Sequence, residues 1–386
     1  MKIMNKKTAL NKTLLFLVTE DWYFISHRLP IAIAAKQQGY NVVVVCRETS
    51  GRKTIEDAGL TFLPLTRMVR SSINPFSELT ALLEIISIYR EVKPDIAHQV
   101  ALKPVIYGGI AGALSTRPSI VNALGGLGFV FSSQKTLARM LKPVLSTLFK
   151  FALRGKSKKL ILQNDFDRSV MLDNGILKDS NIVMIKGAGA NLNEYSVKPL
   201  PEGSPIVLLA ARLLADKGVK EFVDAGRVLS KRGKDCRFVL AGQPDLENPT
   251  SIKQEEIDSW VQEGVIEYWG HQNDMPKALA ASSIFVLPSL YGEGLPKVLI
   301  EAAACGRAIV TTDHPGCRDA IVNDETGILI EGRNVDSLVR AVEHLIDNKQ
   351  LCESMGLKGR KYAEENFAIE QVIEVHLSLY QQLQSI

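Results

Sequence analysis

Short apolar runs alternate with longer amphipathic segments along almost the whole chain. We expect strands in the first half at 14–18, 41–46, 61–64, 95–98, 118–123, 159–163 and 182–185. In the second half we expect strands at 205–211, 236–241, 265–269, 284–288, 308–312 and 326–330. Helical periodicity fills most of the gaps. Repeated strand–helix units with apolar strands predict parallel sheets that are covered by helices on both faces.

A segment rich in glycine and proline, residues 187–205, separates the two series of strands. Few contacts cross such a segment, so it is the expected domain boundary. The sequence thus predicts an α/β protein with two Rossmann-like, doubly wound domains, at residues 1–190 and 204–366. A final helix in 367–386 could cross back to the first domain. The carboxyl ends of both sheets would face a cleft, where ligands bind in such folds.

The net charge of +4 combines two halves of opposite charge. Residues 1–190 contain 26 Lys and Arg against 13 Asp and Glu, whereas residues 191–386 contain 20 against 29. A basic amphipathic helix is expected around 134–154, followed by Lys156, Lys158 and Lys159. A solvated basic face would explain the helix alone, but the bias of the whole half favours contact with an anionic membrane surface. Nucleic acid is not an expected partner, because interleaved aromatic residues are scarce.

Five cysteines without paired spacing argue against a disulfide framework or a zinc site and favour a reducing compartment. No window approaches the roughly 18 uncharged apolar residues that span a bilayer. The first apolar run, 14–18, leads directly into polar residues, which predicts a strand and not a signal peptide. The expected location is the cytoplasm, peripheral on the inner face of the membrane.

Two carboxylates, Glu293 and Glu301, lie eight residues apart in a segment with the pattern of strand, glycine loop and helix. Pro296 suits the first helical position, which would place Glu301 about two turns inside the helix. The helix N-terminus attracts an anion. Acceptors on both sides of a phosphate site suit a nucleotide sugar. The alternative is a capping glutamate and a solvated one.

Two bases, Arg212 and Lys217, follow another expected strand and precede Gly218. Both would project near the carboxyl end of that strand, where they could hold a diphosphate. Two ordinary surface bases beside Asp216 are the alternative interpretation.

Together these segments resemble the retaining glycosyltransferases of family 4, which have the GT-B fold. The matching residues of the second half are Arg212, Lys217-Gly218, Pro288-Ser289, Glu293-Gly294, Glu301-Ala302, Gly306, 316–319 and 323–329. The resemblance is thinner in the first half, at 26–30, 95–98, 125–128 and 163–164. The segments 71–76, 217–222 and 247–249 resemble the branch that adds N-acetylhexosamine to undecaprenyl-diphosphate-linked saccharides.

The resemblance implies a donor site in the second half. Arg212 and Lys217 would hold the donor diphosphate, and Glu293 would accept hydrogen bonds from the sugar. Glu301 would bind the ribose. The backbone N–H groups of Gly294 and Leu295 would complete the phosphate site. No metal or other cofactor is implied, because the UDP-sugar is a co-substrate.

Two departures from the family pattern concern the first half. The loop 19–26 lacks a glycine pair, and Gly125 stands where many members have a histidine after the strand at 118–123. Asp21, His27 and His98 are possible substitutes, and His98 is the expected catalytic residue of this half. A lone histidine, however, is more often structural.

Asp165-Phe166-Asp167 has the form of the metal-binding Asp-x-Asp of the other major glycosyltransferase fold. It follows an expected strand and opens a helix, where aspartate is favoured as a cap or in the first turn. We therefore predict a capping role and no metal.

The sequence as a whole predicts a retaining, metal-independent hexosyltransferase. It would move a sugar, expected to be N-acetylhexosamine, from a UDP-sugar to an undecaprenyl-diphosphate-linked saccharide in bacterial surface polysaccharide, lipopolysaccharide or O-antigen assembly. Two alternatives stay open: a sugar-nucleotide epimerase on the same fold, and a non-catalytic subunit that binds a nucleotide sugar.

Overall fold

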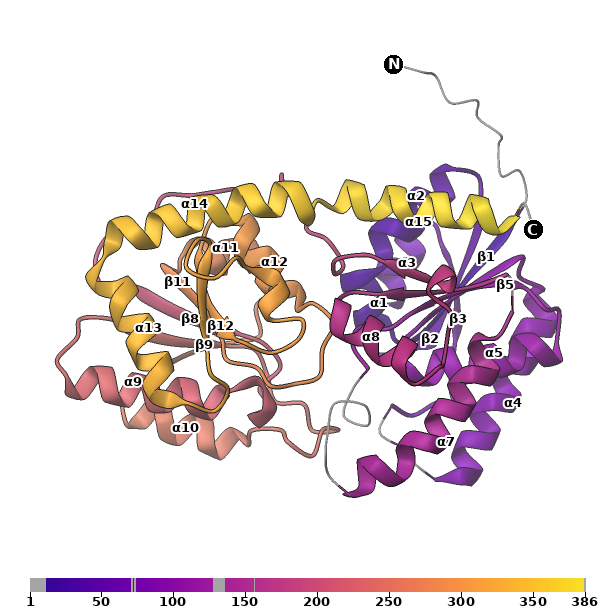
Figure 1. The fold of residues 1–386 in the computed structure, drawn as a ribbon, viewed down its shortest axis with the longest axis horizontal. Coiled ribbons are helices and arrows are strands. Elements are labelled where there is room, and N and C mark those ends of the chain that lie inside the picture. The colour runs from indigo at the N-terminus through magenta and orange to yellow at the C-terminus, as the bar shows by residue number, and fades with distance from the viewer. Residues whose placement is uncertain (1–11, 71, 73, 128–135, 156, 385–386) are drawn as a thin grey trace, which may run out of the picture. The chain divides into compact units, whose positions relative to one another are not determined.

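The chain forms two compact units, here described from a computed structural model (Figure 1). Unit 1 comprises Met1–Ala188 and Glu370–Ile386, and unit 2 comprises Gly189–Ile369. The structure describes residues 12–70, 72, 74–127, 136–155 and 157–384. Several residues singled out in the sequence, among them Ser71, Ile73, Gly128 and Lys156, lie outside this part of the chain.

Unit 1 is built on a seven-stranded parallel sheet with the order β3-β2-β1-β4-β5-β6-β7. Its strands are β1 (Thr13–Glu20), β2 (Asn41–Arg47), β3 (Thr61–Pro64), β4 (Ile96–Val100), β5 (Ser119–Ala123), β6 (Lys158–Leu162) and β7 (Ile182–Met184). Its helices are α1 (Asp21–His27), α2 (Leu29–Gln37), α3 (Arg52–Asp57), α4 (Pro75–Val92), α5 (Leu102–Leu114), α7 (Thr136–Leu153), α8 (Asp165–Asp173), the 3₁₀ helix η1 (Asp179–Asn181) and α15 (Ile369–Gln384).

Unit 2 is built on a six-stranded parallel sheet with the order β10-β9-β8-β11-β12-β13. Its strands are β8 (Ile206–Ala210), β9 (Arg237–Ala241), β10 (Glu267–Gly270), β11 (Ile284–Leu287), β12 (Ala308–Thr312) and β13 (Gly327–Ile330). Its helices are α9 (Val219–Lys231), α10 (Gln254–Gln262), α11 (Met275–Ala280), α12 (Lys297–Ala304), α13 (Val335–Asp347), α14 (Lys349–Asn366) and the 3₁₀ helices η2 (Ala215–Lys217) and η3 (Arg318–Ala320).

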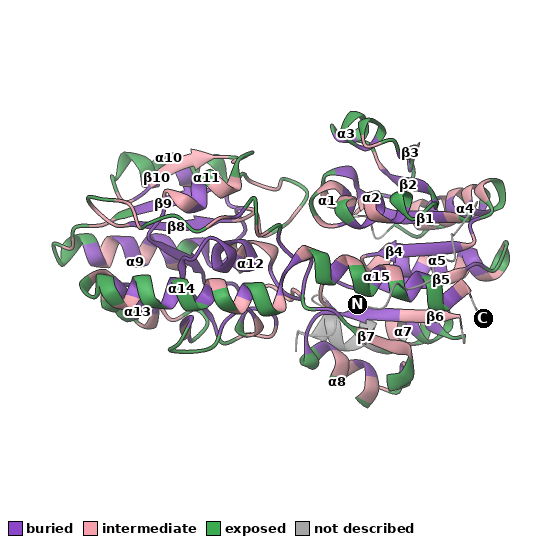
Figure 2. Ribbon diagram, turned by 90° about the horizontal axis from the view of Figure 1, so that it is seen from above, coloured by how far each residue is buried: buried purple, intermediate pink, exposed green. Residues whose placement is uncertain are grey.

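Helices cover both faces of the unit 2 sheet, as the apolar strands predict. Successive residues of β8 point into two separate cores: Val207 and Leu209 pack with α9 and α13, whereas Leu208 and Ala210 pack with α12. Figure 2 accordingly shows buried strands and helices whose outer faces are exposed. The thirteen expected strands and the α/β class are confirmed, because strands buried on both faces leave continuous apolar runs in the sequence.

Each sheet contains one point at which the strand order reverses. In unit 1 it lies between β1 and β4, and in unit 2 between β8 and β11. The loops that follow these paired strands diverge to opposite faces of the sheet and leave a crevice at the carboxyl ends, where ligands of such folds bind. The residues after β8 and β11 are therefore the first place to look for a site in unit 2.

The helix α15 belongs to unit 1, although all of unit 2 precedes it in the chain. The Tyr380 hydroxyl lies 2.6 Å from Nδ1 of His98 on β4, and the Gln384 amide donates to the hydroxyl of Tyr40 at 2.6 Å. The Ser119 hydroxyl donates to the carbonyl of Leu383 at 3.1 Å. These contacts fasten the last helix to the sheet of unit 1.

Candidate active site

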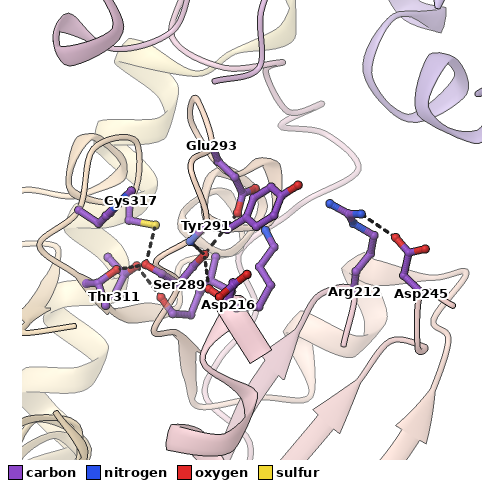
Figure 3. Close-up of polar contacts among 12 residues, drawn as sticks. Arg212, Asp216, Asp245, Ser289, Tyr291, Glu293, Thr311 and Cys317 are labelled. Atoms are coloured by element: carbon purple, nitrogen blue, oxygen red, sulfur yellow. Dashed lines mark hydrogen bonds and ion pairs between the residues drawn. The ribbon is translucent and has the colours of Figure 1, made fainter. Parts of the chain in front are cut away.

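The predicted donor-site residues of unit 2 gather at the reversal point of its sheet. Arg212 lies in the loop after β8, and Lys217 ends η2 two residues before α9 begins. Glu293 lies in the loop between β11 and α12 (Figure 3). These two loops follow neighbouring strands, because β8 pairs with β11 in the sheet.

Backbone contacts hold the two loops together. The N–H of Leu290 donates to the carbonyl of Asp216 at 2.9 Å, and the Ser289 hydroxyl donates to the same oxygen at 3.5 Å (Figure 3). Gly218 has a φ of 77°, and a side chain there would overlap the carbonyl oxygen of Pro288. Glycine is required at this position both for the left-handed backbone and for the close approach of the loops.

A third loop, after β12, supports the loop that carries Glu293. The Thr312 hydroxyl donates to the carbonyl of Ser289, and the Cys317 thiol approaches the same oxygen at 3.9 Å. Gly316 has a φ of 84°, and a side chain there would overlap the carbonyl oxygen of Gly294. The loop is therefore positioned from both sides.

Lys217 and Glu293 form an ion pair between these loops. Lys217 is only 6% exposed, and the Ser289 hydroxyl lies 3.4 Å from the same carboxylate oxygen. An ammonium group with so little contact with water needs a nearby negative charge, because burial disfavours its charged form. Glu293 supplies that charge.

Arg212 has a carboxylate partner of its own. Its guanidinium donates to Asp245 at 2.7 Å (Figure 3). Burial alone would lower the pKa of Arg212, but this hydrogen bond and the nearby Tyr291, Asp245 and Glu293 together outweigh burial and raise it. The ring of Tyr291 lies beside both bases, 5.7 Å from the Arg212 guanidinium carbon and 5.4 Å from the Lys217 nitrogen. The sequence analysis did not identify Asp245 or Tyr291.

Glu301 lies less deep in its helix than predicted. Pro296 is the N-cap and Lys297 the first helical residue, so Glu301 is the fifth residue of α12, just over one turn inside. Its buried carboxylate accepts a hydrogen bond of 2.7 Å from the Tyr195 hydroxyl and pairs with Lys297 at 2.7 Å. Burial and the adjacent carboxylate raise the pKa of Tyr195, which keeps its proton available for this bond.

Gly294 and Leu295 lie immediately before α12, next to Glu293. Leu295 is buried in the core of unit 2, which fixes the path of the backbone there. Pro296 has no side-chain group that could cap the helix. The positive end of the helix is therefore directed at the loop between Glu293 and Pro296.

The candidates of unit 1 have structural partners. Asp21 is fully buried and accepts hydrogen bonds from the N–H groups of Thr49 and Gly51 at 2.6 and 2.7 Å. These bonds and that of the Thr49 hydroxyl outweigh burial and lower the pKa of Asp21. The ring of His27 stacks on Tyr23 at 4.1 Å. The carboxylate of Asp21 is therefore occupied by hydrogen bonds that fix the loop at Thr49 and Gly51.

His98 is fully buried beneath α15 and has no exposed surface with which to contact a substrate. Burial, with His376 and Arg28 nearby, holds the pKa of His98 well below its usual range, so the imidazole is neutral. We therefore leave His98 out of the proposed site.

The Asp165-Phe166-Asp167 sequence forms the first turn of α8, one of the two helix positions that favour aspartate. Asn164 is the N-cap, and its side-chain oxygen accepts from the N–H of Asp167 at 2.8 Å. Asp167 is buried against Asn164, whereas Asp165 is exposed. Within the part of the chain that the structure describes, no group of three or more His, Cys, Asp or Glu residues is placed to hold a metal ion.

Two family models match the chain. "Glycosyl transferase 4-like" matches residues 13–164, and "Glycosyl transferases group 1" matches residues 193–362. The first match lies in unit 1 and the second in unit 2, and together they cover most of the chain.

Similar proteins include bacterial transferases. One is the N,N'-diacetylbacillosaminyl-diphospho-undecaprenol alpha-1,3-N-acetylgalactosaminyltransferase of Campylobacter jejuni, 29% identical over 92% of this chain and 97% of its own length. Another is the UDP-Gal:alpha-D-GlcNAc-diphosphoundecaprenol alpha-1,3-galactosyltransferase of Escherichia coli, 24% identical over 81% of both chains.

Solved structures share the fold along the whole chain. HepE of Anabaena, in complex with UDP and glucose, has a TM-score of 0.77 at 16% identity and covers 97% of this chain and 99% of its own. Sucrose-phosphate synthase from Thermosynechococcus elongatus has a TM-score of 0.79 at 18% identity, with the same coverage. The fold is thus GT-B, and with matching models in both units the chain belongs to the glycosyltransferases, with a type-4-like first half and a group 1 second half.

Proposed function

We propose that this protein transfers N-acetylhexosamine from a UDP-sugar to an undecaprenyl-diphosphate-linked saccharide, with retention of configuration and without a metal ion. The observation that carries the proposal is the meeting of Arg212, Lys217 and Glu293 at the reversal point of the unit 2 sheet. The donor and the acceptor class are those of the Campylobacter and Escherichia relatives taken together.

The donor diphosphate would exchange partners with two carboxylates. In the structure Lys217 pairs with Glu293, and Arg212 pairs with Asp245. A diphosphate that binds both bases supplies the charge that Glu293 supplies now. Glu293 is then free to accept hydrogen bonds from the sugar hydroxyls. Recognition of the sugar would in this way follow recognition of the phosphates.

The ribose would bind to Glu301. Its carboxylate is held by Tyr195 and Lys297 in a buried environment, so it is oriented before the nucleotide arrives. A preoriented acceptor loses little side-chain entropy on binding. The backbone at Gly294 and Leu295, at the positive end of α12, would receive the phosphate oxygens between the two glutamates.

Arg212, Lys217 and the α12 terminus would stabilise the negative charge that develops as UDP leaves the sugar. A fixed electrostatic contact of this kind contributes about 2.7–4 kcal/mol to the transition state. For retention, the acceptor hydroxyl attacks from the face that the diphosphate leaves. A phosphate oxygen of UDP takes the hydroxyl proton as the new glycosidic bond forms. In this route the protein positions the substrates and stabilises the developing charge. No side chain of unit 1 is needed as a base.

Unit 1 would bind the acceptor at an anionic membrane surface, on the cytoplasmic face. The excess of bases in residues 1–190 supports this arrangement, with Lys150 and Arg154 exposed at the end of α7. In the part of the chain that the structure describes, no helix is long and apolar enough to span a bilayer.

A panel of UDP- and GDP-sugars, with and without an undecaprenyl-diphosphate-linked saccharide, tests the proposal. We expect transfer only with the acceptor, from a UDP-N-acetylhexosamine, and unchanged in EDTA. Lys217→Ala or Arg212→Ala should lower the rate roughly 100–1,000-fold. Conversion of a UDP-sugar without acceptor would instead indicate an epimerase. Loss of activity in EDTA with recovery in Mn²⁺ would exclude the metal-free route.

A further inference from the structure

Three large apolar side chains are exposed along one face of α4. Phe76 is 81% exposed, Leu79 is 53% exposed and Leu83 is 57% exposed. Spacings of three and four residues place them on neighbouring turns of one face. Single exposed apolar residues are ordinary, but three in a row form a patch that needs an explanation. We call these three residues the α4 stripe.

The α4 stripe is not part of the core of unit 1. The opposite face of α4 already packs against the sheet through Ala81, Ile85 and Tyr89. Beyond Leu83 the outer face becomes polar, with Ser87 and Arg90 exposed. The stripe is therefore confined to the first half of α4. This half follows the loop after β3 and lies at the carboxyl edge of the sheet.

The charges beside the α4 stripe favour an anionic partner. Arg67 is exposed, and its backbone N–H donates at 2.8 Å to the carboxylate of Glu84, the residue that follows Leu83 on α4. Arg70 lies three residues further along the same loop. The other acid of this half of the helix, Glu78, is paired with Lys103 at 2.8 Å. The Lys103 ammonium also donates to the carbonyl of Val69 at 2.8 Å, which fastens the basic loop beside the stripe.

We propose that the α4 stripe inserts into the headgroup region of an anionic lipid bilayer, with Arg67 and Arg70 at the lipid phosphates. Exposed apolar side chains flanked by bases are the combination that binds such interfaces. Three side chains are far fewer than the roughly 20–30 residues on each side of a stable protein–protein interface. The inference rests on the proposed function, since a lipid-linked acceptor requires the acceptor-binding unit to reach a bilayer.

The first test measures binding of the full chain to phosphatidylcholine vesicles with and without phosphatidylglycerol, in the absence of substrates. We expect binding that requires the anionic lipid. The triple variant Phe76→Ser, Leu79→Gln, Leu83→Gln should bind about 1,000-fold more weakly, at roughly tenfold for each side chain. The matched control is Leu357→Gln on α14, which is also 53% exposed, and it should bind like the wild type. Equal binding of the triple variant and the wild type would overturn the proposal.

A second variant locates the contact without relying on lost binding. The tryptophan fluorescence of Phe76→Trp should be quenched by vesicles that contain brominated lipid. This quenching should exceed that of the wild type, which has three native tryptophans. No added quenching would exclude insertion at α4. Phe151→Ser, between Lys150 and Arg154 on α7, is the competing position. Loss of vesicle binding with Phe151→Ser and not with the triple variant would place the membrane contact on α7 and contradict the proposal.

The last arm separates this inference from the proposed function. With an acceptor whose lipid is short enough to be water-soluble, the triple variant should transfer sugar like the wild type. If the wild type binds vesicles through α4 but transfers no sugar to any acceptor, the proposed function fails while the membrane contact stands. If the triple variant changes a dimer to a monomer and still binds vesicles, the α4 stripe is a contact between copies and the proposal is wrong.

Discussion

At the residue scale, Glu293 and Glu301 differ in their partners and therefore in what their removal should do. Glu293→Gln removes the charge beside Lys217 and one acceptor for the sugar. We expect turnover to fall roughly 100-fold while free UDP binds no more weakly, because UDP itself neutralises Lys217. Glu301→Gln weakens a hydrogen bond to the ribose and should lower UDP affinity roughly tenfold or more. Calorimetry with UDP and steady-state rates distinguish the two variants.

Equal losses of UDP affinity in Glu293→Gln and Glu301→Gln would contradict this assignment. Tyr195→Phe is the matched control for Glu301, since it removes the 2.7 Å hydrogen bond and leaves both the carboxylate and Lys297 in place. Its effect on UDP affinity should have the same direction as that of Glu301→Gln and be smaller.

Some residues of the site follow from the sequence and others do not. Arg212, Lys217 and Glu293 could be proposed from the sequence because each lies in the segment that connects a buried strand to the next helix. Tyr291 and Asp245 could not be assigned, because their contacts with Arg212 join loops that are distant in sequence. The complete burial of His98 could not be predicted for a related reason. A histidine inside a strand that is buried on both faces gives no local sign that a distant helix covers it.

At the scale of elements, the close approach of the β8 and β11 loops depends on the absence of a side chain at Gly218. Gly218→Ala should cost about 1–2 kcal/mol for the left-handed backbone. It should also displace Lys217, because the new methyl group overlaps Pro288. Gly233→Ala is the control, with a φ of 70° and no neighbour within 4 Å. Both variants should unfold at lower temperature, and only Gly218→Ala should lose UDP affinity.

UDP affinity that is equal in the two glycine variants would mean that the approach of the loops does not position Lys217. The elements themselves were largely predictable, since strands buried on both faces are apolar throughout. The start of α12 was misplaced by one residue, because proline is compatible with both the N-cap and the first helical position.

At the scale of the molecule, the two units should respond separately to substitution. Tyr380→Ala in α15 removes a fully buried ring from unit 1 and should lower its free energy of unfolding by about 3–5 kcal/mol, as for a buried phenylalanine. UDP affinity, which we assign to unit 2, should not change. The control is Val375→Ala on the exposed face of the same helix, which should unfold like the wild type. Denaturant unfolding with and without UDP measures both quantities, and a matching loss of UDP affinity would refute the separation.

The strand order and the attachment of α15 required the structure, because they depend on pairings between segments far apart in the chain. Contacts such as that between Tyr380 and His98 leave no periodic pattern around either residue. The opposite charges of the two halves, in contrast, could be counted directly from the sequence.

The return of α15 to unit 1 has a consequence for synthesis on the ribosome. Unit 2 occupies residues 189–369, so all of it is synthesised before the last helix of unit 1 is complete. At roughly 5–20 residues per second, the ribosome needs about 10–40 s to add residues 189–386 after the sheet of unit 1. During that time the surface around His98 has no cover. Unit 1, whose synthesis begins first, is therefore completed only after unit 2.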